Sequence, residues 1–268
     1  MYAFEYQRPA SVTDAKAALG ADARFLAGGQ SLIQAMKLRL SSSERLVDLG
    51  GIADLKGIKV DGGNIVIGAM VTHAAVAASA DVQRACPALA ELAGGIGDPM
   101  VRNMGTIGGS IANADPAACY PAAVVGLGAT IHTNQRTIAA DAFFTGLYET
   151  ALQPGELITA VSFPALHKAA YVKYKQPASR FALVGVVVSQ GAGGVPNGVR
   201  VAVTGAKGSV FRATEIEAAL TTSFTPEAAK AVKMPVTGIN ADMHGSAVYR
   251  AAMISVMASR AVAAVLAR

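Results

Sequence analysis

The feature that most constrains this chain of 268 residues is a glycine-rich stretch at residues 100–116, which reads MVRNMGTIGGSIANADP. Residues 26–32, LAGGQSL, repeat its main element, a Gly-Gly pair close to a small hydroxyl residue. Paired glycines allow tight turns and a close approach to a ligand, because no Cβ stands in the way. Successive N–H groups in such turns form a concave site for an anion. We therefore predict that both loops hold one elongated ligand that carries phosphate.

The elements expected around the first loop agree with this prediction. Residues 24–26 are typical of a short strand, and Ser31 is a suitable N-cap for the helix that follows. A strand, a glycine turn and a helix N-terminus together present free N–H groups and the positive end of a helix dipole to a phosphate. The positions of this helix that we expect to be buried are Leu32, Ile33, Met36, Leu38 and Leu40.

The order of elements predicts an α+β fold with three units. Hydrophobic residues make up 52% of the chain, which is enough to build more than one core. We expect a small α/β unit at residues 1–55 and a larger α+β unit at 56–170. These two form a two-part N-terminal domain, and residues 171–268 form a C-terminal α+β domain with a short antiparallel sheet and helices. Other expectations are a helix at residues 141–147, a hairpin turn at 191–198 and a long helix at 247–266.

Composition argues against several classes of protein. The basic residues behind the net charge of +5 are scattered and form no cluster of the kind that binds nucleic acid. No apolar run is long enough for a membrane span, and the first residues lack the basic and apolar regions of a signal peptide. Cys86 and Cys119 are far apart in the sequence, which favours reduced thiols. We predict a cytoplasmic protein without a membrane span or a nucleic-acid partner.

The sequence lacks the common motifs of nucleotide-binding loops, metal sites and catalytic nucleophiles. It contains no G-x-G-x-x-G, no Walker A loop, no HExxH and no GxSxG. The four histidines show no metal-ligand spacing, and two cysteines cannot hold an iron–sulfur cluster. Two anion-binding loops without an acid–base or nucleophile constellation are typical of a protein that holds a redox cofactor whose own ring reacts.

The two glycine stretches resemble those of a known family. AGGQSL at residues 27–32 and VRNMGTIGGSIANADP at residues 101–116 resemble the two FAD signatures of the FAD-binding (medium) subunit of molybdenum hydroxylases. This family includes carbon monoxide dehydrogenase and the xanthine dehydrogenase and aldehyde oxidase group. The opening FEY and RP at residues 4–9, the stretch 173–188 and Tyr249-Arg250 are also similar to the family, so the resemblance covers nearly the whole chain.

The resemblance implies a set of FAD-binding residues, with the isoalloxazine ring as the reactive group and no catalytic side chain or metal ligand on this chain. The first loop would wrap the pyrophosphate, and the second would hold the pyrophosphate and the ribityl chain. Leu157 or Ile158 would lie by the isoalloxazine, and Lys173 would lie near its polar edge, with Lys175 as the alternative. The full implied set is Ala27, Gly28, Gly29, Gln30, Ser31, Leu32, Asn103, Thr106, Ile107, Gly108, Gly109, Ser110, Asn113, Asp115, Cys119, Leu157, Ile158 and Lys173.

One position departs from the family pattern, in which an Asp commonly stands where this chain has Cys119. A thiol is a much weaker hydrogen-bond partner than a carboxylate. Asp115 or Asn113 could replace the missing carboxylate, so the sequence leaves the role of Cys119 open.

The resemblance also implies partners. A large subunit would carry the molybdenum cofactor, and a small subunit would carry [2Fe-2S] clusters, in a heterotrimer or a dimer of heterotrimers. This chain would pass electrons from those clusters through FAD to an external acceptor. Two alternatives stay open: a non-redox module that binds a nucleotide or dinucleotide, and a stand-alone FAD oxidoreductase.

Overall fold

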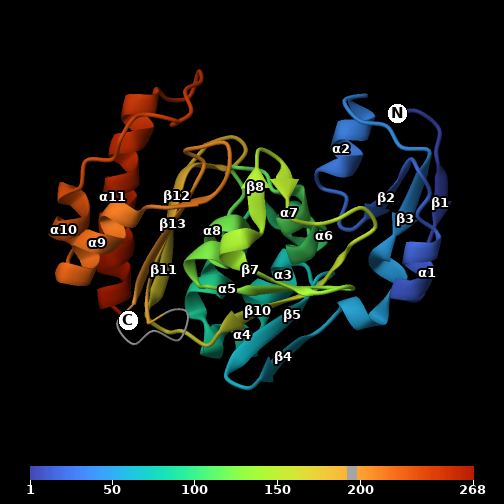
Figure 1. Cartoon of the computed structure of the whole chain (residues 1–268), viewed down its shortest axis with the longest axis horizontal. Coiled ribbons are helices and arrows are strands. Elements are labelled where there is room, and N and C mark those ends of the chain that lie inside the picture. Colours follow the sequence, from blue (N-terminus) through green and yellow to red (C-terminus); the bar gives the residue numbers. More distant parts are fainter. Residues whose placement is uncertain (192–197) are drawn as a thin grey trace.

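The computed structural model describes residues 1–191 and 198–268. Most of the hairpin turn predicted at residues 191–198 lies outside the described residues. Three groups of elements follow one another along the longest axis of the molecule, from the N-terminal strands through a central sheet with its helices to the C-terminal sheet and helices (Figure 1).

The N-terminal group is a small three-stranded sheet with two short helices. Its strands are parallel in the order β1-β3-β2 and span Glu5–Gln7, Arg45–Asp48 and Ala23–Leu26. The helical segments are α1 (Val12–Ala17), α2 (Leu32–Lys37) and the 3-10 turns η1 (Leu49–Gly51) and η2 (Ala53–Leu55). A right-handed crossover is the usual way to join parallel strands, and here each connection contains one short helix.

Helix α2 is shorter than the sequence pattern indicates. It ends at Lys37, and Arg39 has a left-handed backbone conformation with φ of 59°. The chain therefore leaves the helix before Leu38 and Leu40, which are 71% and 79% exposed. Our prediction that these two leucines are buried is wrong. Leu38 follows Met36 by two residues, which is about 200° around a helix, so it lies on the opposite side, and the left-handed Arg39 turns the chain before Leu40.

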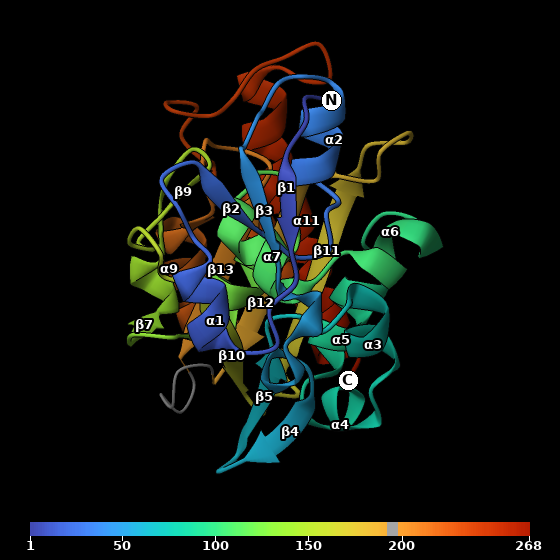
Figure 2. The same cartoon turned by 90° about the vertical axis from the view of Figure 1, so that its right-hand side faces the viewer.

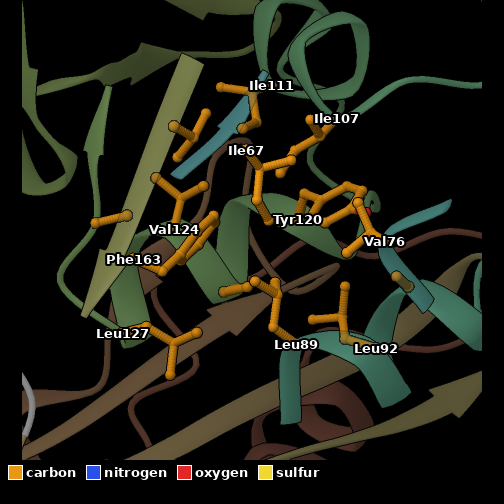
Figure 3. Packing of buried hydrophobic residues seen from close by; sticks show 14 of the residues in the cluster. Ile67, Val76, Leu89, Leu92, Ile107, Ile111, Tyr120, Val124, Leu127 and Phe163 are labelled. Carbon is orange, nitrogen blue, oxygen red and sulfur yellow. The ribbon is translucent and has the colours of Figure 1, made fainter. Parts of the chain in front are cut away.

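The central group is a five-stranded antiparallel sheet covered by helices. Its order is β4-β5-β10-β6-β7, with bounds Ile58–Asp61, Asn64–Gly68, Ile158–Pro164, Thr130–Thr133 and Thr137–Ala139. The helices are α3 (His73–Ala78), α4 (Ala80–Ala85), α5 (Pro87–Gly94), α6 (Pro99–Met104), α7 (Ile107–Asn113) and α8 (Tyr120–Gly126). Side chains of β5 and β10, such as Ile67 and Phe163, pack with Ile107, Ile111 and Val124 of the covering helices (Figure 3).

The helix predicted at residues 141–147 is wrong. The chain instead forms the 3-10 turn η3 (Ala140–Ala142) and a hairpin of β8 (Phe144–Gly146) with β9 (Glu149–Thr150). Phe143 is fully buried and accepts a hydrogen bond from the N–H of Ala151 at 2.8 Å. Burial of this ring fixes the segment in an extended pairing, so tertiary packing overrides the local helical pattern.

The C-terminal group is a four-stranded antiparallel sheet with three helices on one face. Its strands are β11 (Ala169–Lys175), β12 (Ala182–Gln190), β13 (Val199–Thr204) and β14 (Phe211–Arg212), and its helices are α9 (Thr214–Thr222), α10 (Pro226–Ala231) and α11 (Ala247–Leu266). Helix α11 has the bounds predicted from the sequence. By length and composition it could cross a membrane, but half of its most apolar stretch is buried and it packs against β11, β12 and α10.

The cores of these groups share residues across the predicted boundaries. Leu157, which precedes β10, packs in the core of the N-terminal group with Val47 and Ile52. Val187 of β12 packs in the core of the central group. The boundaries at residues 55 and 170 therefore stay a prediction about chain organisation, and the three groups adjoin through buried side chains.

Candidate functional site

The two glycine stretches lie directly against each other. A Cβ on Gly28 would stand 2.0 Å from the carbonyl oxygen of Met104, and a Cβ on Gly109 would stand 3.2 Å from Cβ of Ala27. Both views place the N-terminal group beside α7 (Figure 1 and Figure 2). Close approach of the two backbones therefore requires glycine at position 28. This contact joins two stretches that are 70 or more residues apart in the sequence into one wall.

A cavity of about 470 Å³ opens along this wall and reaches all three groups of elements. Most residues that the resemblance implied line it: Ala27, Gly28, Gly29, Gln30, Ser31, Leu32, Thr106, Gly108, Gly109, Ser110, Asn113, Asp115, Cys119, Leu157, Ile158 and Lys173. Asn103 is exposed on α6, Ile107 is fully buried in the central core, and neither lines the cavity. Lys175 does not line it either, so the geometry favours Lys173 of the two lysines.

The first loop offers free backbone donors to the cavity. Within residues 1–191 and 198–268, the N–H groups of residues 28–32 have no acceptor. Gly29 has φ of 70°, a conformation that glycine adopts without strain and that helps successive N–H groups to converge. The amide of Gln30 donates from Nε2 to the carbonyl of Gly28 at 3.3 Å and braces the turn. These free N–H groups are compatible with the anion site predicted for this loop, which stays a prediction.

The second stretch differs from the predicted loop. It folds into α6 and α7, and the first N–H groups of α7 are already bonded. Ile107 donates to the carbonyl of Val71 at 3.0 Å, Gly108 to that of Ala69 at 2.9 Å, and Gly109 to the Thr106 hydroxyl at 3.2 Å. The expected nest of free amides is therefore absent from the start of α7, and this stretch contributes side chains such as Ser110 and Asn113 to the wall.

Gly108 serves packing in this arrangement. A Cβ at this position would lie 2.6 Å from Cβ of Ala69 and 2.8 Å from its carbonyl oxygen. The missing side chain lets α7 lie on the connection between β5 and α3, which is what brings the Gly108 N–H within reach of the Ala69 carbonyl.

The connection between β11 and β12 lines the cavity through Ser179, Arg180 and Phe181. Lys173 Nζ donates to the carbonyls of Gly95 at 2.8 Å and Arg180 at 2.7 Å, and it lies 3.4 Å from Sγ of Cys119. Arg180 in turn donates from Nη1 to the carbonyl of Gly97 at 3.2 Å. These bonds attach the C-terminal sheet to the turn before α6.

The structure adds residues to the site that sequence reasoning missed. Met70 lines the cavity from the connection between β5 and α3, His73 lines it from the start of α3, and Glu156 and Phe181 line it from later segments. Phe181 is 46% exposed, so its ring is available at the rim. The one sequence signal for Phe181 is an aromatic residue close to the stretch that contains Lys173. His73, Met70 and Glu156 become neighbours of the cavity only in the folded chain.

His73 is a neutral group in the cavity wall. It is only 5% exposed, and burial, with a smaller contribution from Arg102, lowers its pKa to about 4. Its Nδ1 has no hydrogen-bond partner among the residues that the structure describes. A neutral imidazole adds no charge to the cavity wall.

Glu156 fixes the turn that presents Leu157 and Ile158. Its carboxylate accepts from Arg136 Nε at 3.0 Å, from the Thr133 hydroxyl at 2.7 Å and from the N–H of Gln153 at 2.8 Å. The side chain is fully buried, and the hydrogen bond from Arg136 is the main cause that lowers its pKa to about 2.

Replacing this carboxylate should change the acid stability of the protein. Because the pKa of Glu156 falls on folding, its ionised form contributes stability above about pH 4.5 that is lost as the pH falls toward 2. We expect E156Q to lower the unfolding free energy at pH 7 by roughly 1–3 kcal/mol and to flatten its decline between these pH values. Chemical denaturation across pH measures both. The same change at exposed Glu149 is the control, and equal pH profiles for E156Q and the wild type would contradict the assignment.

The cavity meets the chemical requirements of a flavin dinucleotide. Free amides at residues 28–32 suit a pyrophosphate, and the small polar side chains of α7 suit hydroxyl groups. Met70, Leu157 and Ile158 offer an apolar wall for a planar ring, and Lys173 offers a cation at its edge. Within the described residues, no group of His, Cys, Asp and Glu side chains could hold a metal ion. The fold and site together define a protein of the flavin-binding class.

Comparisons with known proteins identify the family. The family described as "FAD binding domain in molybdopterin dehydrogenase" matches residues 2–166. The carbon monoxide dehydrogenase medium chain of Afipia carboxidovorans is 40% identical over 274 residues, which covers 97% of this chain and 95% of that one. The nicotine 6-hydroxylase medium subunit of Paenarthrobacter nicotinovorans is 34% identical, with 97% and 96% covered. The solved structure of reconstituted CO dehydrogenase from Oligotropha carboxidovorans has a TM-score of 0.91 at 38% identity, covering 100% of this chain and 99% of that chain.

The chain therefore belongs to the FAD-binding medium subunits of the molybdenum hydroxylases. The resemblance drawn from the two glycine stretches, the α+β fold and the FAD cofactor are confirmed.

Proposed function

We propose that this chain carries FAD as the electron-transfer subunit of a multi-subunit molybdenum hydroxylase. A small partner subunit with [2Fe-2S] clusters delivers electrons, and this chain passes them to an external acceptor. A large partner subunit oxidises the substrate at its molybdenum cofactor. The observation that carries the proposal is the cavity itself, in which free amides, small polar side chains, an apolar wall and one lysine occur in the combination that FAD needs.

Each part of the cavity has an assigned task. Residues 28–32 bind the pyrophosphate through their N–H groups, with Ala27 at the contact with the second stretch. Ser110, Asn113 and Asp115 provide partners for the ribityl hydroxyls. Leu157 and Ile158 exclude water from one side of the isoalloxazine, and Lys173 holds a positive charge at its edge. When bound, FAD supplies the reversible uptake of electrons.

Several properties support a place in a larger assembly. Relatives carry names such as medium chain and medium subunit, which describe components of multi-subunit enzymes. The chain has only two cysteines, both buried and unpaired with each other, so it cannot ligate an iron–sulfur cluster by itself. We propose a heterotrimer or a dimer of heterotrimers. Free thiols also favour the cytoplasm as its location.

Co-purification with the partner subunits tests this proposal. We expect a yellow complex with flavin absorbance that bleaches on reduction, together with molybdenum and iron in elemental analysis. A colourless complex that binds a plain nucleotide would instead support the non-redox alternative. Oxidation of an organic substrate by the isolated chain would support a stand-alone oxidoreductase.

A further inference from the structure

Lys173 is a cation held without a counter-charge. Its Nζ contacts two backbone carbonyls, those of Gly95 and Arg180, and the sulfur of Cys119. None of the ion pairs among residues 1–191 and 198–268 includes this lysine. All three contacts fix the position of the ammonium, and neither carbonyl carries a formal charge.

The carboxylates that line the same cavity are engaged elsewhere. Glu156 accepts two hydrogen bonds from the Arg136 guanidinium and is paired with that cation. Asp115 accepts the N–H of Ala117 at 2.8 Å and lies beside Tyr148, whose pKa is raised by burial and by this carboxylate. The positive charge of Lys173 is therefore available to a ligand in the cavity.

Cys119 occupies the position from which a charged side chain could neutralise Lys173. It is the N-cap residue of α8, is 5% exposed and lines the cavity together with the lysine. The phenol of Tyr171 packs beside it, and burial together with the neighbouring thiol raises the pKa of Tyr171. A thiol is a weak hydrogen-bond partner, whereas a carboxylate at this distance would form an ion pair with the ammonium.

We propose that Cys119 is a positioning residue that holds the Lys173 ammonium at the isoalloxazine end of the cavity without neutralising it, and so raises the reduction potential of bound FAD. This inference rests on the proposed function. Reduction adds negative charge to the flavin, and an uncompensated cation in a cavity with low effective dielectric stabilises that charge more strongly than a neutralised one. The residue acts through Lys173 and takes no part in electron transfer itself.

The test compares C119D with C119N in the complex with its partner subunits. The two side chains have nearly the same shape and differ in charge. Redox titration of the flavin absorbance gives the midpoint potential, and extraction gives the FAD content. We expect C119D to lie about 30 mV or more below C119N, which corresponds to a tenfold change for a two-electron couple. C119N should stay close to the wild type. Equal potentials in C119D and C119N would overturn the inference.

A second variant covers the case in which C119D fails to fold or to retain FAD. K173Q removes the cation itself and should lower the potential in the same direction as C119D. A K173Q complex that holds FAD at the wild-type potential would overturn the inference. Absence of FAD from the wild-type complex would contradict the proposed function. Bound FAD whose reduction potential does not change with the charge at positions 119 and 173 would contradict only this inference.

Discussion

A G28A variant is expected to lose FAD. The added carbon would lie 2.0 Å from the Met104 carbonyl oxygen and 2.8 Å from Cα of Gly105, so the two glycine stretches would have to separate. Both obstacles are backbone atoms and cannot rotate away as a side chain would. Overpacking costs about 1–3 kcal/mol even where neighbours can move, and a loss of this size in binding corresponds to roughly a fivefold to 150-fold loss of affinity. Flavin content after purification and titration with free FAD measure the effect.

The control for this variant is G20A in the same group of elements. A Cβ on Gly20 would meet only Nη1 of Arg45, at the ordinary distance of 3.7 Å. We expect G20A to retain FAD and the wild-type unfolding midpoint. If G28A also kept its full flavin content, the contact between the two stretches would have no part in holding the cofactor.

The second large effect is expected for R250M in helix α11. Arg250 is 3% exposed, and its Nη1 donates to the carbonyls of Leu183 at 2.7 Å and Gly205 at 2.9 Å. Its Nη2 bonds Asp242 Oδ2 at 2.6 Å. Leaving a buried acceptor without its donor costs about 1–3 kcal/mol, so we expect the loss of both carbonyl bonds to cost about 2–6 kcal/mol. Denaturant unfolding should show a loss of this size.

R250M should also lower the affinity for FAD, although Arg250 does not line the cavity. The N–H of Gly205 donates to the carbonyl of Pro116, and the Thr204 hydroxyl lies within hydrogen-bond distance of the carbonyls of Pro116 and Ala118 and shares its one proton between them. These bonds hold the segment between Asp115 and Cys119, so we expect lower FAD content as well as lower stability. D242N is the matched control, with a smaller loss, because the Asp242 side chain is 47% exposed. Equal losses in R250M and D242N would show that the ion pair, and not the carbonyl bonds, supports this region.

The sequence predicted local elements best where one periodic pattern was long. Helix α11 was predicted with its observed bounds, because Ile254, Met257 and Ala261 repeat at helical spacing and all face the core. Prediction was wrong where a few buried side chains outweighed local preference. Buried Phe143 accompanies a turn and a strand at residues 141–147, and the left-handed Arg39 ends the pattern before Leu40.

The glycine stretches show the same division within the site. The sequence predicted that both stretches bind one ligand. The free amides of residues 28–32 agree with the physical reason given for the first stretch. For the second, the amides of Ile107 and Gly108 are used by the carbonyls of Val71 and Ala69. Those carbonyls are nearly 40 residues earlier in the chain, so no local pattern could reveal that these donors are occupied.

The sequence by itself determined the family, the cofactor and the α+β fold, because the order and spacing of residues 27–32 and 101–116 are local properties of the chain. Only the tertiary structure decided what surrounds the cofactor cavity. It placed His73 and Glu156 in the wall, joined Lys173 to Gly95, and set Cys119 beside an ammonium that no carboxylate neutralises within the described chain. Charge pairing and burial depend on distances between segments far apart in sequence, and folding alone fixes those distances.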